Sequence, residues 1–279
     1  MKRPSRLLLT LPVLLLAGFY LHNLKNSLIF HPDPAIYRTP ADLNLKYEDL
    51  TLTASDGNEL GAWFVPGPGP LTFLIFSGNG GNMSQMADRL AAFRAAGWSA
   101  LTVDYPGYGR SQGRPGEEGT YQAAEAAWKY LTETRDAKPD QIVIYGFSLG
   151  GGVAARLAEE RRPGALILDS TFTRLADVPT IYRPWANKIF KLLMNDVYNT
   201  AESLKRIDCP LIVLHCAGDT AVPYALGRAL FEGYENGPKT LVTGRGDHLD
   251  FLFNKNEYLK AIEKFLKDTR VGLPSTRPE

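Results

Sequence analysis

The sequence predicts an α/β fold with an eight-stranded, mostly parallel sheet, helices on both faces and a small helical cap. Three observations predict this class. Short apolar runs alternate with segments of helical periodicity, a hairpin pattern precedes them, and one connection is much longer than a crossover requires. With 44% apolar and 22% charged residues, the 279-residue chain can fill one large core. We therefore expect one domain over residues 46–272.

The N-terminal segment differs from the rest of the chain. Basic residues within the first six positions precede an apolar run from Leu7 to Leu21, an arrangement shared by signal peptides and signal anchors. Leucine occupies the −3 position of the candidate cleavage motif at residues 16–18, so we predict an uncleaved anchor over residues 1–24 and a tether over 25–45. The basic residues favour the cytoplasmic side, which places the domain on the non-cytoplasmic (periplasmic or extracellular) side of the membrane. A cleaved signal peptide is the alternative.

The strands of the domain are predicted from two patterns. YEDLTLTA and ELGAWFV alternate in polarity around the turn Ser55-Asp56-Gly57-Asn58, which is typical of a hairpin. The strands that follow are buried apolar runs, each ended by turn residues. They cover residues 71–77, 99–104, 141–147, 165–169, 210–215 and 239–244.

Helical patterns follow most of these runs. They cover residues 86–97, 120–134, 149–160 and 257–268. Strands that alternate with helices predict a parallel sheet that is covered on both faces.

The long connection, residues 173–208, is expected to form the cap. Its apolar side chains either pack on the sheet or line an acyl or aromatic pocket. Residues 273–279 form a short tail. The apolar cap residues are Ile181, Tyr182, Trp185, Ile189, Phe190, Leu192, Leu193 and Met194.

Charge and cysteine usage exclude several classes of function. The net charge of +1, with both signs mixed along the chain, gives no basic stripe for nucleic acid. Cys209 and Cys216 bracket one predicted strand, whose rise of roughly 3.3 Å per residue places their Cα atoms about 20 Å apart. We therefore expect free thiols and no metal site. The glycine-rich loop SGNGGNMSQ lacks the Lys-Ser/Thr of a phosphate loop, so no nucleotide cofactor is expected.

Two serines match the pattern G-x-S-x-G: Ser148 in GFSLG and Ser111 in GRSQG. Ser148 ends a buried strand and begins a helix, and this setting predicts a strained serine whose Oγ is exposed above the sheet. Ser111 lies in a loop with no strand directly before it and no helix directly after it. The setting favours Ser148 as a nucleophile and a loop role for Ser111.

A serine hydroxyl needs a base to become a nucleophile at neutral pH. Of the four histidines, His22 and His31 fall in the anchor and the tether. His215 lies at a strand end, where a packed, hydrogen-bonded histidine is typical. His248, in GRGDHLD, follows the last strand and is the predicted base, with His215 as the alternative.

The acid that orients the base is expected on a loop at the carboxyl end of a strand. Asp219, in HCAGDTAVP, meets this requirement and is the prediction. Asp169, which ends ALILD, is the alternative. Asp247 and Asp250 lie too close to His248 in sequence to accept its Nδ1–H without distorting the loop.

Acyl transfer also needs N–H donors for the oxyanion that develops. The backbone N–H of Leu149 is one, because it lies at the start of a helix whose dipole favours negative charge. The second is expected from the loop after residues 71–77. There Gly78 permits a tight turn, and the N–H of Asn79 is the best candidate.

Over residues 46–270, these motifs taken together resemble the α/β-hydrolase superfamily. The sequence is similar to its anchored, depalmitoylase-like and lysophospholipase-like branch, close to the serine aminopeptidase-like group. The motifs are SGNGGNM at 77–83, DYPGYGRSQG at 104–113, GFSLGGG at 146–152, DSTF at 169–172, HCAGDTAVP at 215–223 and GRGDH at 244–248.

The resemblance implies the α/β-hydrolase fold and a catalytic triad of Ser148, Asp219 and His248, with oxyanion donors from Asn79 and Leu149. Two positions depart from the family pattern. Ser77 stands where histidine is usual, and aspartate replaces the usual glycine directly before the base. Because the oxyanion donors are backbone groups, the first departure bears more on loop rigidity and substrate preference than on activity.

The implied activity is that of a serine hydrolase that cleaves acyl esters or thioesters through an acyl-enzyme, without a cofactor. A small-molecule acyl ester or thioester is the expected substrate, with lipids and acylated proteins in the same class. A serine peptidase or amidase would use the same triad. A catalytically silent membrane-anchored scaffold that keeps the fold is the alternative from a different class.

Overall fold

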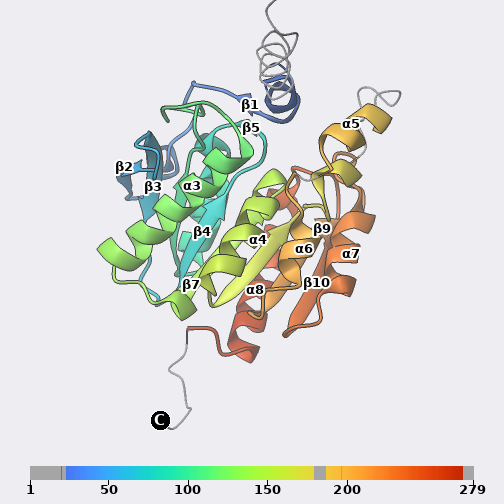
Figure 1. The fold of residues 1–279 in the computed structure, drawn as a ribbon. Helices are drawn as coiled ribbons and strands as arrows, with labels where there is room; N and C mark the ends of the chain where they lie inside the picture. Colours follow the sequence, from blue (N-terminus) through green and yellow to red (C-terminus); the bar gives the residue numbers. More distant parts are fainter. Residues whose placement is uncertain (1–19, 21–22, 179–186, 196, 273–279) are drawn as a thin grey trace, which may run out of the picture.

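The structure, a computed structural model, describes residues 20, 23–178, 187–195 and 197–272 (Figure 1). Its main sheet has eight strands, each within two residues of a predicted run or hairpin arm. They are β2 (Glu48–Thr53), β3 (Glu59–Val65), β4 (Thr72–Phe76), β6 (Ser99–Val103), β7 (Ile142–Phe147), β8 (Ala165–Asp169), β9 (Leu211–Cys216) and β10 (Lys239–Gly244).

The strand order is β10-β9-β8-β7-β4-β6-β3-β2. All neighbours from β10 to β6 pair in parallel, whereas β3 pairs antiparallel with both β6 and β2. The eight-stranded, mostly parallel sheet is thus confirmed. Because β7 lies near the middle, its carboxyl end is flanked on both sides by the loops of neighbouring strands.

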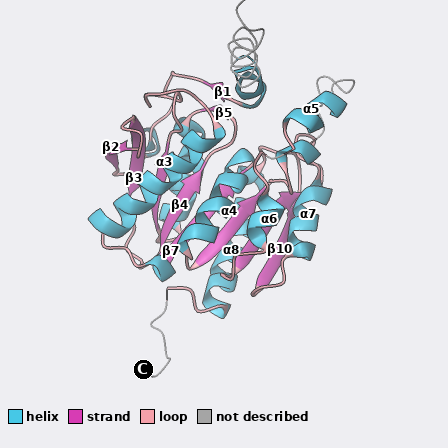
Figure 2. Cartoon of the chain, in the orientation of Figure 1, coloured by secondary structure: helices cyan, strands magenta, loops and turns pink. Residues whose placement is uncertain are grey.

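Helices cover both faces of the sheet, as predicted (Figure 2). One face packs against α3 (Glu117–Lys129), α4 (Leu149–Arg161), α6 (Thr200–Leu204) and α7 (Tyr224–Gly233). The other packs against α2 (Ala87–Ala95) and α8 (Phe251–Asp268). Successive strand residues enter opposite layers, so Ile144 of β7 lies in the first core and Tyr145 in the second.

Two helices differ from their predicted bounds. The pattern at 120–134 begins earlier, at Glu117, and its last five residues, Tyr130–Thr134, form a π-helical turn. The last helix begins at Phe251 rather than at residue 257. Phe251 and Asn254 are both buried in its first turn, and the polar Asn254 interrupts the apolar stripe by which the helix was recognised.

The predicted cap is partly a covering layer. Its second half forms α6, which packs against α4 and α7, while α5 (Asn187–Leu193) projects above the carboxyl ends of the strands (Figure 1). Met194 is fully buried, whereas Leu192 is 80% exposed. The predicted cap residues therefore serve both structural and surface roles. Ile181, Tyr182 and Trp185 lie outside the described residues.

The predicted tether is folded against the domain from Ile29 onward. Ile29 and Phe30 are only 4% exposed and belong to the core, which moves the start of the packed domain N-terminal to residue 46. After them β1 (His31–Pro32) pairs in parallel with β5 (Gly80–Gly81) in a separate two-stranded sheet.

Within the described part of the chain, no helix is both long and apolar enough to span a membrane. The predicted anchor over residues 1–24 falls almost entirely outside the described residues and stays a prediction. Cys209 and Cys216 are buried free thiols, as expected.

Candidate active site

Ser148 connects β7 to α4 in a conformation that residues other than glycine rarely adopt, with φ 52° and ψ −120°. Three hydrogen bonds hold this turn. The Ser148 N–H donates to the Asp169 carbonyl at 2.9 Å. The Ser148 carbonyl accepts from Thr171 Oγ1 at 2.6 Å and from the Gly151 N–H at 2.9 Å. The strained serine turn predicted from the sequence is present.

Glycine flanks the serine because the backbones of three elements meet there. A Cβ at Gly146 would collide with the carbonyl of Gly150, and a Cβ at Gly150 would collide with the carbonyls of Phe76 and Ser77. The glycines thus let α4 begin directly against the ends of β7 and β4.

Ser148 is less open than its sequence setting predicts, with only 8% of its surface exposed. The loop after β4 covers it: a Cβ added to Gly78 would lie 3.6 Å from the Ser148 Cβ. The ring of His248 contacts the residue before the serine, with its centroid 5.0 Å from that of Phe147. The loop after β4 and the loop that follows β10 therefore both approach the end of β7, where Phe147 and Ser148 lie.

Ser111, the second serine with the same motif, has a structural role. It is buried, its Oγ accepts the Gly61 N–H at 3.0 Å, and it donates to the Asp104 carbonyl at 3.1 Å. These two bonds use the hydroxyl to join the loop after β6 to β3.

Asp219 and His248 are paired. They follow the adjacent parallel strands β9 and β10, so both loops leave the same edge of the sheet. The His248 Nδ1 lies 2.7 Å from the Asp219 Oδ2. The other carboxylate oxygen, Oδ1, accepts the N–H groups of Ala221 at 2.9 Å and Val222 at 2.7 Å. The carboxylate is therefore fixed by the backbone on one side and faces the imidazole on the other.

A second histidine contacts the same carboxylate. His215 is fully buried, and its Nε2 lies 3.2 Å from the Asp219 Oδ2 and 2.8 Å from the Val222 carbonyl. Since both neighbours are acceptors, His215 Nε2 carries the proton. His215, the alternative base, is thus a packed histidine that contacts the predicted acid. The sequence predicted its packing but not this contact.

The pKa of Asp219 reflects these neighbours. Burial alone would raise the pKa of this carboxyl, but hydrogen bonds from His215 and His248 outweigh burial and hold the pKa well below its ordinary value. Asp219 therefore stays ionised at neutral pH and can only accept hydrogen bonds. It follows that His248 donates from Nδ1, which leaves Nε2 as the atom that can take a proton.

Asp169, the alternative acid, interacts with residues other than the histidines. Its Oδ2 forms a buried ion pair with Arg89 at 3.1 Å and accepts the hydroxyl of Tyr145. The Arg89 guanidinium lies over the rings of Phe147, at 4.3 Å, and Phe251, at 4.5 Å. This network adjoins the serine turn, because Asp169 also accepts the Ser148 N–H and Phe147 directly precedes the serine.

Asp247, at the position where the family usually has glycine, joins two loops of the site. Its Oδ1 accepts the Thr220 N–H and the His248 N–H, each at 2.7 Å. These hydrogen bonds lower the pKa of Asp247. The loop that carries Asp219 is thereby tied to the loop that carries His248.

The two predicted oxyanion donors belong to segments that adjoin the serine. Leu149 is the first residue of α4, and Asn79 follows Gly78 in the loop that covers Ser148. Among the described residues, neither backbone N–H has a hydrogen-bond acceptor, as an oxyanion donor requires. Ser148 and His248 are not hydrogen-bonded to each other within the described residues, and such bonds often tighten only when substrate binds.

Asp104 is a buried carboxylate for which the sequence predicted no individual role. Its Oδ1 accepts the Met83 N–H at 2.6 Å, while Oδ2 is buried without a partner among the described residues. Burial raises the pKa of Asp104 to about 7, although the Met83 N–H and the charge of Arg110 oppose the shift. Its position in the DYPGYG motif, directly after a buried strand, was the available signal.

Asp104 is expected to make the stability of the protein depend on pH. Because its pKa is higher in the folded state than in the unfolded state, the contribution of Asp104 to stability is complete below about pH 4 and is lost as the pH rises through about 7. A shift of this size corresponds to about 4 kcal/mol. Asp104→Asn keeps an acceptor for Met83 and should reduce that loss, measured by urea unfolding between pH 4.5 and 8. An unchanged pH dependence would contradict this account.

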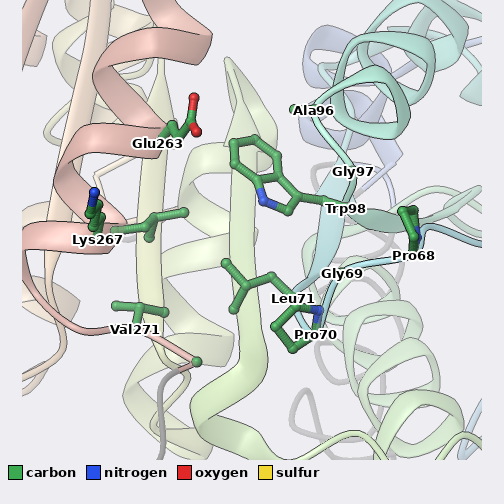
Figure 3. A pocket seen from close by; sticks show the side chains of 12 residues that line it. Pro68, Gly69, Pro70, Leu71, Ala96, Gly97, Trp98, Glu263, Lys267 and Val271 are labelled. Carbon is green, nitrogen blue, oxygen red and sulfur yellow. The ribbon is translucent and has the colours of Figure 1, made fainter.

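A pocket of about 420 Å³ lies elsewhere on the domain (Figure 3). Leu71 and Trp98, which line it, directly precede β4 and β6, so it opens at the amino ends of the strands. Ser148 lies at the opposite edge. The described lining contains Glu263 and Lys267 but no serine, histidine or cysteine, so we do not associate this pocket with the predicted chemistry.

Fold and site together define an α/β hydrolase, and comparison with known proteins agrees. A family model described as "Serine aminopeptidase, S33" matches residues 71–204. An uncharacterized protein from Mycobacterium tuberculosis strain H37Rv is 34% identical over 253 residues, covering 88% of this chain and 89% of the relative. The alpha/beta hydrolase domain-containing protein WAV2 of Arabidopsis thaliana is 32% identical over 205 residues, covering 66% of each chain. The chain belongs to the α/β-hydrolase superfamily.

Solved structures show the same fold. The esterase Pf2001 of Pyrococcus furiosus superimposes with a TM-score of 0.73 at 20% identity, covering 86% of this chain and 98% of the esterase. An alpha-beta hydrolase from Vibrio vulnificus gives a TM-score of 0.71 at 21% identity and covers 95% of each chain.

Proposed function

We propose that this hydrolase cleaves acyl ester or thioester bonds through an acyl-enzyme formed on Ser148. The observation that carries the proposal is the Asp219–His248 pair, joined at 2.7 Å, beside a serine held at φ 52°. A base oriented by a buried carboxylate next to a strained serine is the arrangement that serine acyl transfer requires.

The reaction follows from this geometry. Ser148 Oγ attacks the acyl carbonyl carbon while His248 Nε2 takes the hydroxyl proton, and Asp219 stabilises the imidazolium through Nδ1–H. The carbon–oxygen or carbon–sulfur bond to the leaving group then breaks, and His248 returns the proton to that group. A water molecule, deprotonated by the same nitrogen, attacks the acyl-enzyme. The acid is released, and the proton returns to Ser148.

The negative oxygen of each tetrahedral intermediate would be held by the N–H groups of Asn79 and Leu149. Both donors are backbone groups, and Leu149 adds the positive end of the α4 dipole. In such sites one donor contributes about 10²- to 10³-fold to the rate. Serine at position 77, where the family usually has histidine, leaves both backbone donors in place. This supports activity despite the departure from the family pattern.

The surface around the site favours an apolar acyl group. Leu249 directly follows His248 and is 75% exposed, and Phe253 in the first turn of α8 is 72% exposed. On α5, Leu192 and Ile189 are exposed as well. Exposed apolar side chains next to a reactive centre suit an acyl chain better than a charged peptide terminus.

We expect purified full-length protein to hydrolyse medium-chain nitrophenyl esters at least tenfold faster, in kcat/KM, than aminoacyl anilides, because the surface by the site is apolar. A fluorophosphonate should add once, measured by intact mass. Acyl thioesters are tested alongside the esters.

Two results would contradict the proposal. Faster cleavage of the anilides would indicate a peptidase, the reading that the serine aminopeptidase match supports. No adduct and no turnover by folded protein would indicate a silent scaffold.

A further inference from the structure

The N-terminal segment Ile29–Ala35, which we call the strap, crosses the loop that holds Asn79. Figure 1 shows β1 of the strap beside β5, at the end of the sheet where α5 projects. The buried side chains of Ile29 and Phe30 fix the start of the strap in the core. The strap is therefore a fixed part of the domain rather than a loose linker.

Backbone hydrogen bonds join the strap to this loop at two points. The His31 N–H donates to the Asn79 carbonyl at 2.9 Å, and the Asp33 N–H donates to the Gly81 carbonyl at 3.0 Å. The Asn79 carbonyl also accepts the Tyr108 hydroxyl at 2.6 Å. Two donors on one carbonyl fix the peptide plane between Asn79 and Gly80.

Side chains of the loop bind the strap in return. Asn79 Nδ2 donates to the Ile29 carbonyl at 3.0 Å. Asn82 Nδ2 donates to the carbonyls of Asp33, at 2.9 Å, and Ala35, at 2.7 Å. The Asn82 Oδ1 at the same time caps the following turn by accepting the Ser84 N–H at 2.9 Å.

These contacts hold two of the three groups on the Asn79 Cα, namely the carbonyl and the side chain. The third group is the N–H that would face the oxyanion. Glycines at 78, 80 and 81 give the loop little stiffness of its own, because glycine adopts many backbone conformations. A constraint from outside the loop is therefore needed to keep the N–H in one direction.

We propose that the strap is a positioning element for the oxyanion site. It acts through Asn79 without touching substrate, so catalysis depends on residues that lie N-terminal to the hydrolase motifs. This inference rests on the proposed function, because it assigns the strap to the same oxyanion. A small misplacement of one donor is expected to lower kcat by about tenfold to a hundredfold and to leave KM nearly unchanged.

A matched pair at His31, made in the full-length chain, tests the backbone contact. His31→Pro removes the N–H that donates to Asn79, whereas His31→Ala keeps it and removes only an exposed side chain. We expect ester kcat and the rate of fluorophosphonate labelling to fall together in His31→Pro, with KM within twofold of wild type. His31→Ala should match wild type.

Asn82→Asp provides a second test that does not depend on how proline is tolerated. The carboxylate still caps Ser84 but cannot donate to Asp33 or Ala35, so the same fall in kcat is expected. Arg38→Gln is the control, because the Arg38–Asp88 ion pair joins the next part of the segment to α2 rather than to the oxyanion loop. It should leave kcat unchanged.

The outcomes separate the two proposals. A wild-type protein that neither labels nor turns over esters contradicts the proposed function itself. An active wild type together with folded His31→Pro and Asn82→Asp variants whose kcat equals that of His31→Ala overturns the positioning role. A change in KM alone also overturns it. If His31→Pro fails to fold, as judged by thermal unfolding, Asn82→Asp decides.

Discussion

Ser148→Ala is expected to lower ester kcat/KM by about 10⁴-fold or more and to abolish labelling by fluorophosphonate. The substitution removes the only atom that forms the acyl-enzyme in the proposed mechanism. Alanine must adopt the same φ of 52°, so the strain of the turn is kept and stability should change little. Initial rates, intact mass and thermal unfolding measure the three effects.

Ser111→Ala is the matched control, since it removes a serine hydroxyl from the second match to the same five-residue pattern. Its loss leaves the buried Gly61 N–H without its acceptor, so we expect about 1–3 kcal/mol of destabilisation with turnover and labelling kept. Labelling that survives in Ser148→Ala but disappears in folded Ser111→Ala would reverse the assignment of the nucleophile.

Asp219→Asn is expected to lower kcat by about 10⁴-fold. The amide offers one acceptor oxygen where the carboxylate uses two: Oδ2 faces the N–H groups of His215 and His248, and Oδ1 faces two backbone N–H groups. Either orientation of the amide therefore sets N–H against N–H. Steady-state kinetics on a nitrophenyl ester measures the loss.

The same substitution should also reduce stability in a pH-dependent way. The pKa of Asp219 is lowered in the folded state, so its ionised form stabilises the fold at neutral pH, and that contribution is lost as the pH falls through the folded-state pKa. The stability difference between wild type and Asp219→Asn should shrink in strong acid.

Asp169→Asn is the comparison for Asp219→Asn. It should weaken the Arg89 ion pair and lower stability, but keep kcat in the folded fraction. A greater loss of kcat in Asp169→Asn would favour Asp169 as the acid.

Much of the fold could be predicted because most of its strands give a clear hydrophobic pattern in the sequence. Except for β10, which lies at the edge of the sheet and is only partly buried, the parallel strands are buried on both faces and appear in the sequence as continuous apolar runs, each ended by turn residues. The serine turn was equally clear, because a strand, a serine between glycines and a helix follow one another without a gap. In both cases the signal is local, so one sequence is sufficient.

What could not be predicted depends on residues far apart in the chain. Arg89 lies in a helical pattern where a charge suggests an exposed face, yet it is buried against Asp169, 80 residues later. The strap escapes recognition because β1 and β5 have two residues each, too few to show any periodicity. The contact between His215 and Asp219 depends on how the loop after β9 turns back on its own strand.

The strained turn at Ser148 also determines when the site can form. Its conformation is held by Asp169 and by Thr171, which is 23 residues further along the chain, and the histidine that would activate it belongs to a loop after the last strand. During synthesis, which proceeds from the N-terminus, the serine is made long before the groups that shape and activate it. In the proposed mechanism the emerging chain therefore carries an ordinary serine, and its reactivity would arise only when almost the entire protein has folded.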